Sequence, residues 1–292
     1  MIEQNVIWIA SYPKSGNTWI HSVLRRAGLK YGFPQVDMDI YNILRNRSQL
    51  SICNSIDQQF SQTPVTVIKT HSQFRDNVQM HQYPDLEFVN KAYIHVYRNP
   101  LDVLLSYLNY TRLEYKAHVN DKEYTKKIFT DMLGLNHLYS YDEWLDMNLD
   151  SLPVECLDHA LDYFSDNDMT LPIFADMSGS WLENTRSWLA ASQTLPGYSL
   201  RYEDCLVDPE QFFKLTDFFI FSRNDVISAL KDINNEAISK SVGGNQEYAI
   251  FFNKMKAYYF IDYFSSNAIN RFLSRYERDL KQLGYESLFN LI

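Results

Sequence analysis

The sequence predicts an α/β fold, a three-layer sandwich in which a central parallel sheet of about five strands is flanked by helices. Two observations support this prediction. Short apolar runs alternate with amphipathic helical patterns along the chain, and such alternation gives parallel strands that are covered on both faces. No Pro/Gly/Ser-rich linker, internal repeat or low-complexity tract divides the 292 residues, so we expect a single domain over residues 1–292.

The first strand is predicted over residues 6–10, a continuously apolar run rich in β-branched and aromatic residues. A helix follows, because apolar residues repeat at helical spacing at Ile20, Val23, Leu24 and Ala27. Between them, residues 11–19 read Ser-Tyr-Pro-Lys-Ser-Gly-Asn-Thr-Trp. A turn that opens a helix aims backbone N–H groups and the positive end of the helix dipole at one spot. Lys14 adds a full positive charge, so the sequence predicts a phosphate or sulfate site here.

The later elements continue the alternation. Further strands are predicted over residues 65–68, 92–97 and 198–202. Helices are predicted over residues 100–108, with Asn99 as the cap, and over 181–189, 209–219 and 269–283, with Gly284 as the last C-cap; residues 31–60 and 112–150 predict short helices and loops. Ligands of parallel sheets bind at the carboxyl ends of the strands. Residues at or just after predicted strand ends, which we therefore expect to converge, are Lys14, His71, Arg98 and Tyr202.

Composition excludes several classes of function. A net charge of −9 with 46% hydrophobic residues describes a globular protein without a broad nucleic-acid-binding surface. Cys53, Cys156 and Cys205 are widely spaced and form no C-x-x-C pair, so we expect reduced thiols and no metal site. The first strand begins too near Met1 for an export signal, and no apolar run approaches the roughly 20 residues of a membrane span. We expect a soluble, cytoplasmic protein with no transmembrane segment.

The run at residues 11–19 lacks the paired glycines and the following lysine of a Walker A loop. It resembles instead the 5′-phosphosulfate-binding loop of the sulfotransferases that use 3′-phosphoadenosine 5′-phosphosulfate (PAPS). The resemblance continues to Tyr285 and implies a fold like that of P-loop nucleoside triphosphate hydrolases. It implies that Trp19 stacks on the adenine. It also implies that the 5′-phosphosulfate is held by Lys14, Ser15, Gly16, Asn17 and Thr18.

Arg98 and Ser106 form a second anion-binding pair, because an arginine fork and a hydroxyl can hold one phosphate. The run at residues 97–106 is similar to the family segment that binds the 3′-phosphate of PAPS, which implies that role for both residues. Tyr202 opens a Tyr-Glu-Asp run, and the family tyrosine in such a run lies near the adenine amino group. Buried aromatic packing is the alternative for both Trp19 and Tyr202.

Residues 253–260 are the counterpart of the family's Arg-Lys-Gly-x-x-Gly-Asp/Asn-Trp stretch, which completes the 3′-phosphate pocket. Only Lys254 matches; both glycines are replaced, the first by Met255, although glycine allows a backbone to approach a phosphate closely. Three outcomes stay open. Lys254 and Lys256 bind the phosphate by their side chains alone, the cofactor binds more weakly than usual, or the site has decayed.

His71 follows the second strand in the run Ile-Lys-Thr-His. An imidazole with a pKa near 6.5 can take the proton of a hydroxyl that is a poor nucleophile at neutral pH. The resemblance implies that His71 is the catalytic base. It also implies that Lys14 stabilises the leaving phosphate, and that Lys69 supports the same charge or the sulfonate oxygens.

The predicted function is therefore sulfuryl transfer from PAPS, leaving 3′-phosphoadenosine 5′-phosphate (PAP), to a hydroxyl or amine of a small-molecule or glycan acceptor, without a metal. Two alternatives stay open. A nucleotide kinase-like phosphoryl transferase is disfavoured by the missing Walker A lysine and the lack of an evident Mg²⁺-binding acid. A catalytically silent PAP- or sulfate-binding module is suggested by the altered stretch at residues 253–260. The acceptor and the oligomeric state stay open, with a homodimer among the options.

Overall fold

The computed structural model describes residues 2–34, 53–54, 56–58, 61–75, 78–79, 86–242 and 256–291. Most of the predicted short helices and loops of residues 31–60, and Lys254, lie outside the described residues. The chain divides into two compact units. The first comprises Met1–Arg98, Met177–Gly179 and Glu183–Ser239, and the second comprises Asn99–Asp176, Ser180–Leu182 and Lys240–Ile292. The prediction of one domain over residues 1–292 stays a prediction.

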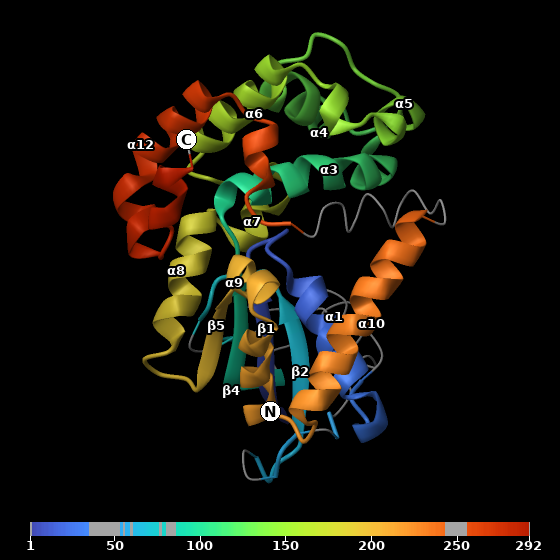
Figure 1. Cartoon of the computed structure of the whole chain (residues 1–292), viewed down its shortest axis with the longest axis vertical. Coiled ribbons are helices and arrows are strands. Elements are labelled where there is room, and N and C mark those ends of the chain that lie inside the picture. Colours follow the sequence, from blue (N-terminus) through green and yellow to red (C-terminus); the bar gives the residue numbers. More distant parts are fainter. Residues whose placement is uncertain are drawn as a thin grey trace. The chain divides into compact units, whose positions relative to one another are not determined.

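The first unit is built on a sheet in which four strands pair in parallel in the order β2–β1–β4–β5. These strands are β1 (Ile2–Ser11), β2 (Val65–Thr70), β4 (Leu86–Tyr97) and β5 (Gly197–Arg201). Figure 1 labels these four strands. A short β3 (Val78–Gln79) joins β4 in the antiparallel direction as the fifth strand. The predicted α/β class with a central parallel sheet is confirmed, but four strands are parallel where about five were predicted, and β1 and β4 are longer than predicted.

Helices accompany these strands in the order expected for crossover connections. They are α1 (Asn17–Ala27), the 3₁₀ turn η1 (Leu29–Tyr31), α8 (Trp181–Ala191), α9 (Tyr202–Val207), η6 (Pro209–Asp217) and α10 (Arg223–Val242). The helix predicted over residues 209–219 is the 3₁₀ helix η6, whose first N–H is accepted by the Asp208 side chain. The sequence analysis did not predict α9 or α10.

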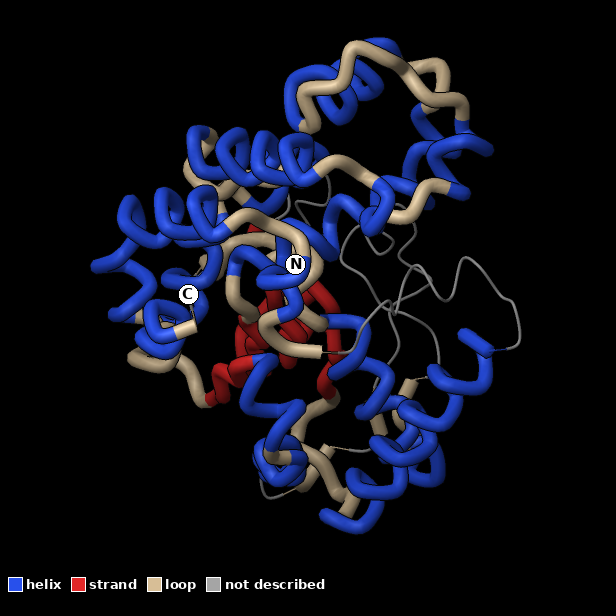
Figure 2. The backbone as a smooth tube through the Cα atoms, turned by 45° about the horizontal axis from the view of Figure 1, so that its top comes forward, coloured by secondary structure: helices blue, strands red, loops and turns tan. Residues whose placement is uncertain are grey.

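One face of the sheet packs against α8. Side chains alternate along a strand, so Val6, Trp8 and Ala10 share a face, and they form one buried cluster with Trp188. On the opposite face of β1, Ile7 is also 0% exposed. A parallel strand that is covered on both faces needs a continuous apolar run, which explains the sequence at residues 6–10. Figure 2 shows the strands gathered together with helices around them.

His95 lies inside this core, fully buried on β4. Its ring stacks with Tyr97 at a centroid distance of 5.6 Å and with Trp188 at 6.2 Å. Its Nδ1 lies 3.1 Å from the Ser199 hydroxyl on β5. Burial lowers the pKa of His95 to about 3, because a charged imidazole would lose its hydration here. His95 is therefore neutral in the folded protein near pH 7.

The second unit is helical among its described residues. Its elements are α3 (Pro100–His118), α4 (Lys122–Lys126), the π-helical turn η3 (Lys127–Met132), α5 (Tyr141–Asp146), η4 (Leu149–Ser151), α6 (Val154–Asp166), η5 (Pro172–Phe174), η7 (Tyr259–Asp262), α12 (Ser266–Gln282) and η8 (Glu286–Asn290); α7 (Ala175–Ser178) has residues in both units. Asn99 caps α3 as predicted, since its side chain accepts the Asp102 N–H. Gly284 follows α12 with a φ of +82°, as predicted for a C-terminal glycine.

Asp102 connects the first turn of α3 to the C-terminal segment. Its carboxylate, 0% exposed, accepts hydrogen bonds from the N–H groups of Tyr258 (2.8 Å) and Phe260 (3.1 Å) and from the Asn99 amide (2.9 Å). Tyr258 has a φ of +58°, and it stands where the similar family stretch has its second glycine. The left-handed conformation costs a non-glycine residue about 1 kcal/mol, which these charge-assisted hydrogen bonds offset.

A first prediction concerns the pH dependence set by His95. Its pKa is near 6.5 in the unfolded chain and about 3 in the folded protein, so the unfolded chain takes up the proton first as the pH falls. The stability due to neutral His95 is complete above pH 6.5 and is lost toward pH 3, by up to about 1.4 kcal/mol per pH unit. Urea unfolding at pH 7 and pH 5 should show a smaller loss in His95→Gln, which does not titrate. Equal losses in both proteins would contradict the prediction.

A second prediction concerns Asp102→Ala, which leaves two buried donors and one partly buried donor without their acceptor. We expect the free energy of unfolding to fall by about 3 kcal/mol, measured by urea unfolding. Asp166→Ala is the matched control, because Asp166 forms an exposed ion pair with Arg275 and should cost less than about 1 kcal/mol. Similar losses in the two variants would show that Asp102 does not anchor the segment.

Candidate functional site

The loop after β1 is a strained turn. The Ser15 N–H donates to the Tyr12 carbonyl (3.2 Å), with Pro13 in the second position and Lys14 in the third. Lys14 has a φ of +69°, a conformation that the third position of a type II turn requires and that glycine normally supplies. Such a residue costs of order 1 kcal/mol, and strain of this kind is typical of functional sites. Lys14 therefore occupies this position at a cost to stability.

Gly16 begins α1 with a φ of +113°. A Cβ atom at this position would lie 2.8 Å from Cδ2 of the Tyr202 ring, so both the backbone angle and the space require glycine. No side chain caps α1, and its first turn contains no acidic residue. The first N–H groups of a helix have no acceptor within the helix, so this end of α1 can bind an anion.

Asn17 and Thr18 follow in the first turn of α1. Asn17 is 3% exposed, and its amide nitrogen donates to the carbonyls of Ile9 (3.2 Å) and Thr70 (3.1 Å). Its side chain thus joins the carboxyl ends of β1 and β2, which leaves its backbone N–H for a ligand. Thr18 is half-buried, and its carbonyl accepts the Ser22 hydroxyl (2.7 Å).

Tyr202 packs between the loop and Arg98. The Arg98 guanidinium carbon lies 4.3 Å from the centre of the Tyr202 ring, whose edge meets Trp19 at a centroid distance of 5.2 Å. Trp19 also packs edge-on against Phe212 at 4.9 Å. Arg98, Trp19 and Tyr202 are each 6% exposed. The ring contacts with Gly16 and Arg98 therefore place the predicted 3′-phosphate arginine beside the predicted 5′-phosphosulfate loop.

His71 directly follows β2, as predicted, and is half-buried. Its Nδ1 lies 2.9 Å from the Ser11 carbonyl and 3.2 Å from the Ser11 hydroxyl. A carbonyl only accepts, so Nδ1 carries the proton of the neutral ring and the lone pair is on Nε2. Nε2 can then take a proton. Lys69, 8% exposed, pairs with Ile9 in the β1–β2 register.

The strand register shows why these residues meet. Ala10 pairs with Thr70, Ser11 with Val96, and Tyr97 with Arg201, so the four carboxyl ends form one edge of the sheet. The structure brings together at this edge the loop of residues 11–19, His71, Arg98 and Tyr202. Tyr202 is the first residue of α9 rather than the last residue of the strand, which is a correction to the sequence analysis.

The remaining predicted site residues are Lys69, which is the fifth residue of β2, Ser106 and Lys254. Ser106 is half-buried on α3 in the second unit, and Lys254 lies outside the described residues. The sequence analysis also missed three residues that bind the His71 turn, namely Ser11, Asn184 and Trp188. The sequence did contain a sign of Asn184 and Trp188. They lie four residues apart, and therefore on one face, in the predicted helix of residues 181–189.

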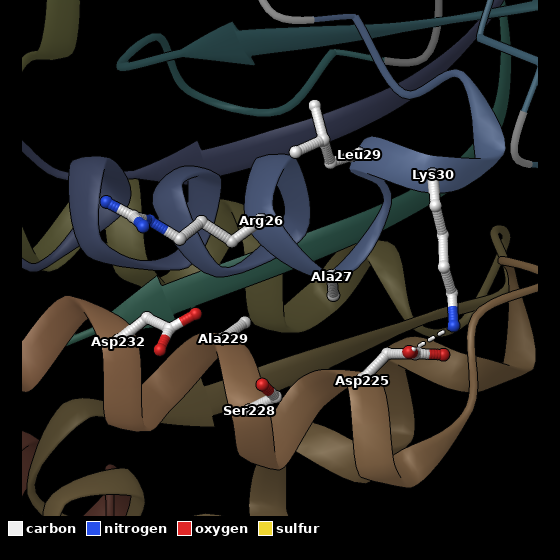
Figure 3. Close-up of a pocket in the computed structure, with 8 residues that line it drawn as sticks. All are labelled: Arg26, Ala27, Leu29, Lys30, Asp225, Ser228, Ala229 and Asp232. Atoms are coloured by element: carbon white, nitrogen blue, oxygen red, sulfur yellow. Dashed lines mark ion pairs between the residues drawn. The ribbon is translucent and has the colours of Figure 1, made fainter.

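A hollow of about 210 Å³ lies between the C-terminal end of α1 and α10 (Figure 3). Lys30 Nζ is 2.7 Å from Asp225 Oδ1, and the Tyr31 hydroxyl donates to the same carboxylate (3.0 Å). The hydrogen bond from Lys30 holds the pKa of Asp225 well below its usual range. The hollow lies at the opposite end of α1 from the loop, and protein groups already bind this carboxylate.

In the part of the chain that the structure describes, no three His, Cys, Asp or Glu side chains are arranged to hold a metal ion. None of the described helices combines the length and the apolar character of a membrane span. The described part of the candidate site contains cations, helix N–H groups and one histidine at a sheet edge.

The chain matches one family model and resembles solved structures. A family model described as the sulfotransferase domain matches residues 4–284. A mouse sulfotransferase complexed with PAP has 16% sequence identity and a TM-score of 0.52, over 99% of this chain and 89% of that chain. A retinol dehydratase in complex with androsterone and PAP has 15% identity and a TM-score of 0.46, over 95% of this chain and 80% of that chain. The likeness to the mouse structure shows a shared fold. The search of curated proteins found no match.

A third prediction follows from the Gly16–Tyr202 contact. Gly16→Ala places a methyl group 2.8 Å from the Tyr202 ring, which must shift and take Arg98 with it. We expect PAP to bind at least about 10-fold more weakly in isothermal titration, a loss of about 1.4 kcal/mol. Gly32→Ala is the control, because Gly32 also has a positive φ (+80°) but follows η1, at the opposite end of α1. Equal affinities in both variants would exclude the contact as a determinant of binding.

Proposed function

The chain belongs to the sulfotransferase domain family, and from this premise we propose that it transfers a sulfuryl group from PAPS to a hydroxyl or amine of a small-molecule or glycan acceptor. One observation gives the proposal its strongest support. The hydrogen bond from His71 Nδ1 to the Ser11 carbonyl puts an imidazole, whose neutral form has its lone pair on Nε2, at the first residue of the anion-binding loop. A base and an anion site at one edge of a sheet are what transfer to a hydroxyl needs.

The loop fits the 5′-phosphosulfate by the chemistry of its donors. The start of α1 has no side-chain cap, and the backbone N–H groups of Gly16, Asn17 and Thr18 are the donors for the anion. The Ser15 hydroxyl is fully buried and has no hydrogen-bond partner among the described residues, so a ligand oxygen would satisfy it. Lys14 supplies the cation.

Arg98 and Ser106 hold the 3′-phosphate in this proposal, and Lys254 completes the pocket. Arg98 offers a planar fork that matches two phosphate oxygens. Trp19 and Tyr202 contact the adenine. Both rings also pack within the unit, so most of their surface is already covered.

When bound, PAPS supplies an activated sulfuryl group whose S–O bond to phosphate breaks as the acceptor O–S bond forms. His71 Nε2 takes the proton of the acceptor hydroxyl. Lys14 stabilises the negative charge that grows on the departing phosphate oxygen of PAP, and Lys69 supports that charge or the sulfonate oxygens. The cytoplasmic location and the homodimer stay predictions.

A fourth prediction tests the base. We expect His71→Ala to lower kcat by about 10²- to 10⁴-fold for transfer from labelled PAPS to a panel of phenols, alcohols and amines. The Kd for PAP should change by less than about twofold, because His71 acts on the acceptor. His159→Ala is the matched control, since His159 makes the same kind of bond, from Nδ1 to the Met132 carbonyl (3.0 Å), in the second unit.

Other outcomes would favour the alternatives. Tighter binding of ATP with Mg²⁺ than of PAP would favour a phosphoryl transferase. PAP binding without turnover on any acceptor of the panel would favour a silent binding module. Unchanged kcat in His71→Ala would exclude His71 as the base while leaving sulfuryl transfer in place.

A further inference from the structure

The turn that carries His71 is held by α8 through its backbone. The Asn184 amide nitrogen donates to the His71 carbonyl at 2.8 Å, and the Trp188 indole N–H donates to the Ser72 carbonyl at 2.9 Å. Asn184 and Trp188 are 0% and 2% exposed. Two consecutive carbonyls are thus bound by two buried side chains that lie one helical turn apart.

A third residue of the same helix face binds the next part of the turn. The Phe74 N–H donates to the Ser187 hydroxyl at 2.9 Å, and that hydroxyl donates in turn to the Asn184 carbonyl at 2.7 Å. Positions 184, 187 and 188 share one face because they are spaced three and four apart. We call Asn184, Ser187 and Trp188 the α8 clamp.

Asn184 also joins the turn to a second backbone segment. Its amide nitrogen lies 3.4 Å from the Ser178 carbonyl as well as 2.8 Å from the His71 carbonyl. Both partners are acceptors, so this end of the side chain must be the donating NH₂ group. A side chain without a donor here would leave a buried carbonyl unsatisfied, at about 1–3 kcal/mol.

Trp188 is itself held firmly. Its ring packs against Phe74 at a centroid distance of 5.2 Å, Tyr93 at 5.8 Å and His95 at 6.2 Å. Phe74 belongs to the His71 turn, so the turn both accepts a hydrogen bond from Trp188 and packs on its ring. Close packing against these aromatic rings limits the movement of the Trp188 ring, which makes it a firm support.

These contacts complete a three-point attachment of His71. Its ring is held by the Ser11 carbonyl, its own carbonyl by Asn184, and the following carbonyl by Trp188. The ring bond selects the tautomer, but it keeps Nε2 in place only if the backbone of the turn does not move. A displacement of about 1 Å in a reacting group can lower a rate about 10²-fold.

We propose that Asn184 and Trp188 are positioning residues for His71, which fix the backbone of its turn so that Nδ1 stays on Ser11 and Nε2 faces the acceptor. The inference rests on the proposed function, because it gives the clamp a catalytic purpose. Neither residue touches substrate in this account. Their effect passes through His71.

The first experiment measures transfer from PAPS in Asn184→Ala and Trp188→Phe, alone and combined with His71→Ala. We expect each single variant to lower kcat about 10- to 100-fold while KM for PAPS changes less than about twofold. In the His71→Ala background, neither substitution should lower kcat further, because the group that they position is gone. Equal losses in both backgrounds would overturn the inference.

Trp144→Phe is the matched control for Trp188→Phe. It removes an indole N–H that donates to the Thr111 hydroxyl (3.3 Å) in the core of the second unit. The control should leave kcat within about twofold of the unaltered chain, although it also removes a buried hydrogen bond. A loss in Trp144→Phe as large as in Trp188→Phe would indicate a general effect of core damage.

The second experiment needs no acceptor. In ¹⁵N-histidine NMR spectra, the His71 signals are assigned by their absence in His71→Ala. We expect the Nδ1–H tautomer in the unaltered chain and a mixture of tautomers in Asn184→Ala and Trp188→Phe. An unchanged His71 tautomer in both variants would overturn the positioning role even if the chain transfers no sulfuryl group. Failure to bind PAP would instead count against the proposed function.

Discussion

The contact between the Tyr202 ring and Gly16 is the constraint on which the candidate site depends. Because a Cβ atom at Gly16 would come within 2.8 Å of the ring, the loop, Trp19 and Arg98 can assemble only around a glycine with a positive φ. The same ring lies under the Arg98 guanidinium at 4.3 Å. One aromatic side chain from the start of α9 thus sets the spacing between the cation that follows β4 and the turn after β1.

The site is otherwise held together by buried polar side chains that act on backbone groups. Asn17 binds the carbonyls of Ile9, near the end of β1, and of Thr70, the last residue of β2, and the α8 clamp binds the turn after β2. Hydrogen bonds of this kind are strong in a buried setting and costly to break, so they fix geometry more firmly than apolar packing alone. His71 gains its tautomer and its position from these neighbours, and the chemistry proposed for it depends on both.

In the second unit, Asp102 stabilises a segment that lacks the two glycines of the corresponding sulfotransferase stretch. Tyr258 adopts a left-handed conformation, and the Asp102 carboxylate binds the N–H groups of Tyr258 and Phe260. The chain therefore keeps a sharp turn at this position by hydrogen bonding rather than by the freedom of glycine. A buried carboxylate needs hydrogen-bond donors in place of water, and Asp102 has three of them in this turn.

The sequence by itself determined the parallel sheet, its four main strands, the loop of residues 11–19 and the position of His71, because periodicity and turn chemistry are local properties. It did not predict α10, although Val226, Ala229, Leu230 and Ile233 are buried there at helical spacing. Only the tertiary structure decided that Tyr202 lies on Gly16 and under Arg98, and that Asn184 and Trp188 hold the His71 turn. These pairs are more than 100 positions apart in most cases, and such contacts are set by the packing of whole elements, which no local pattern encodes.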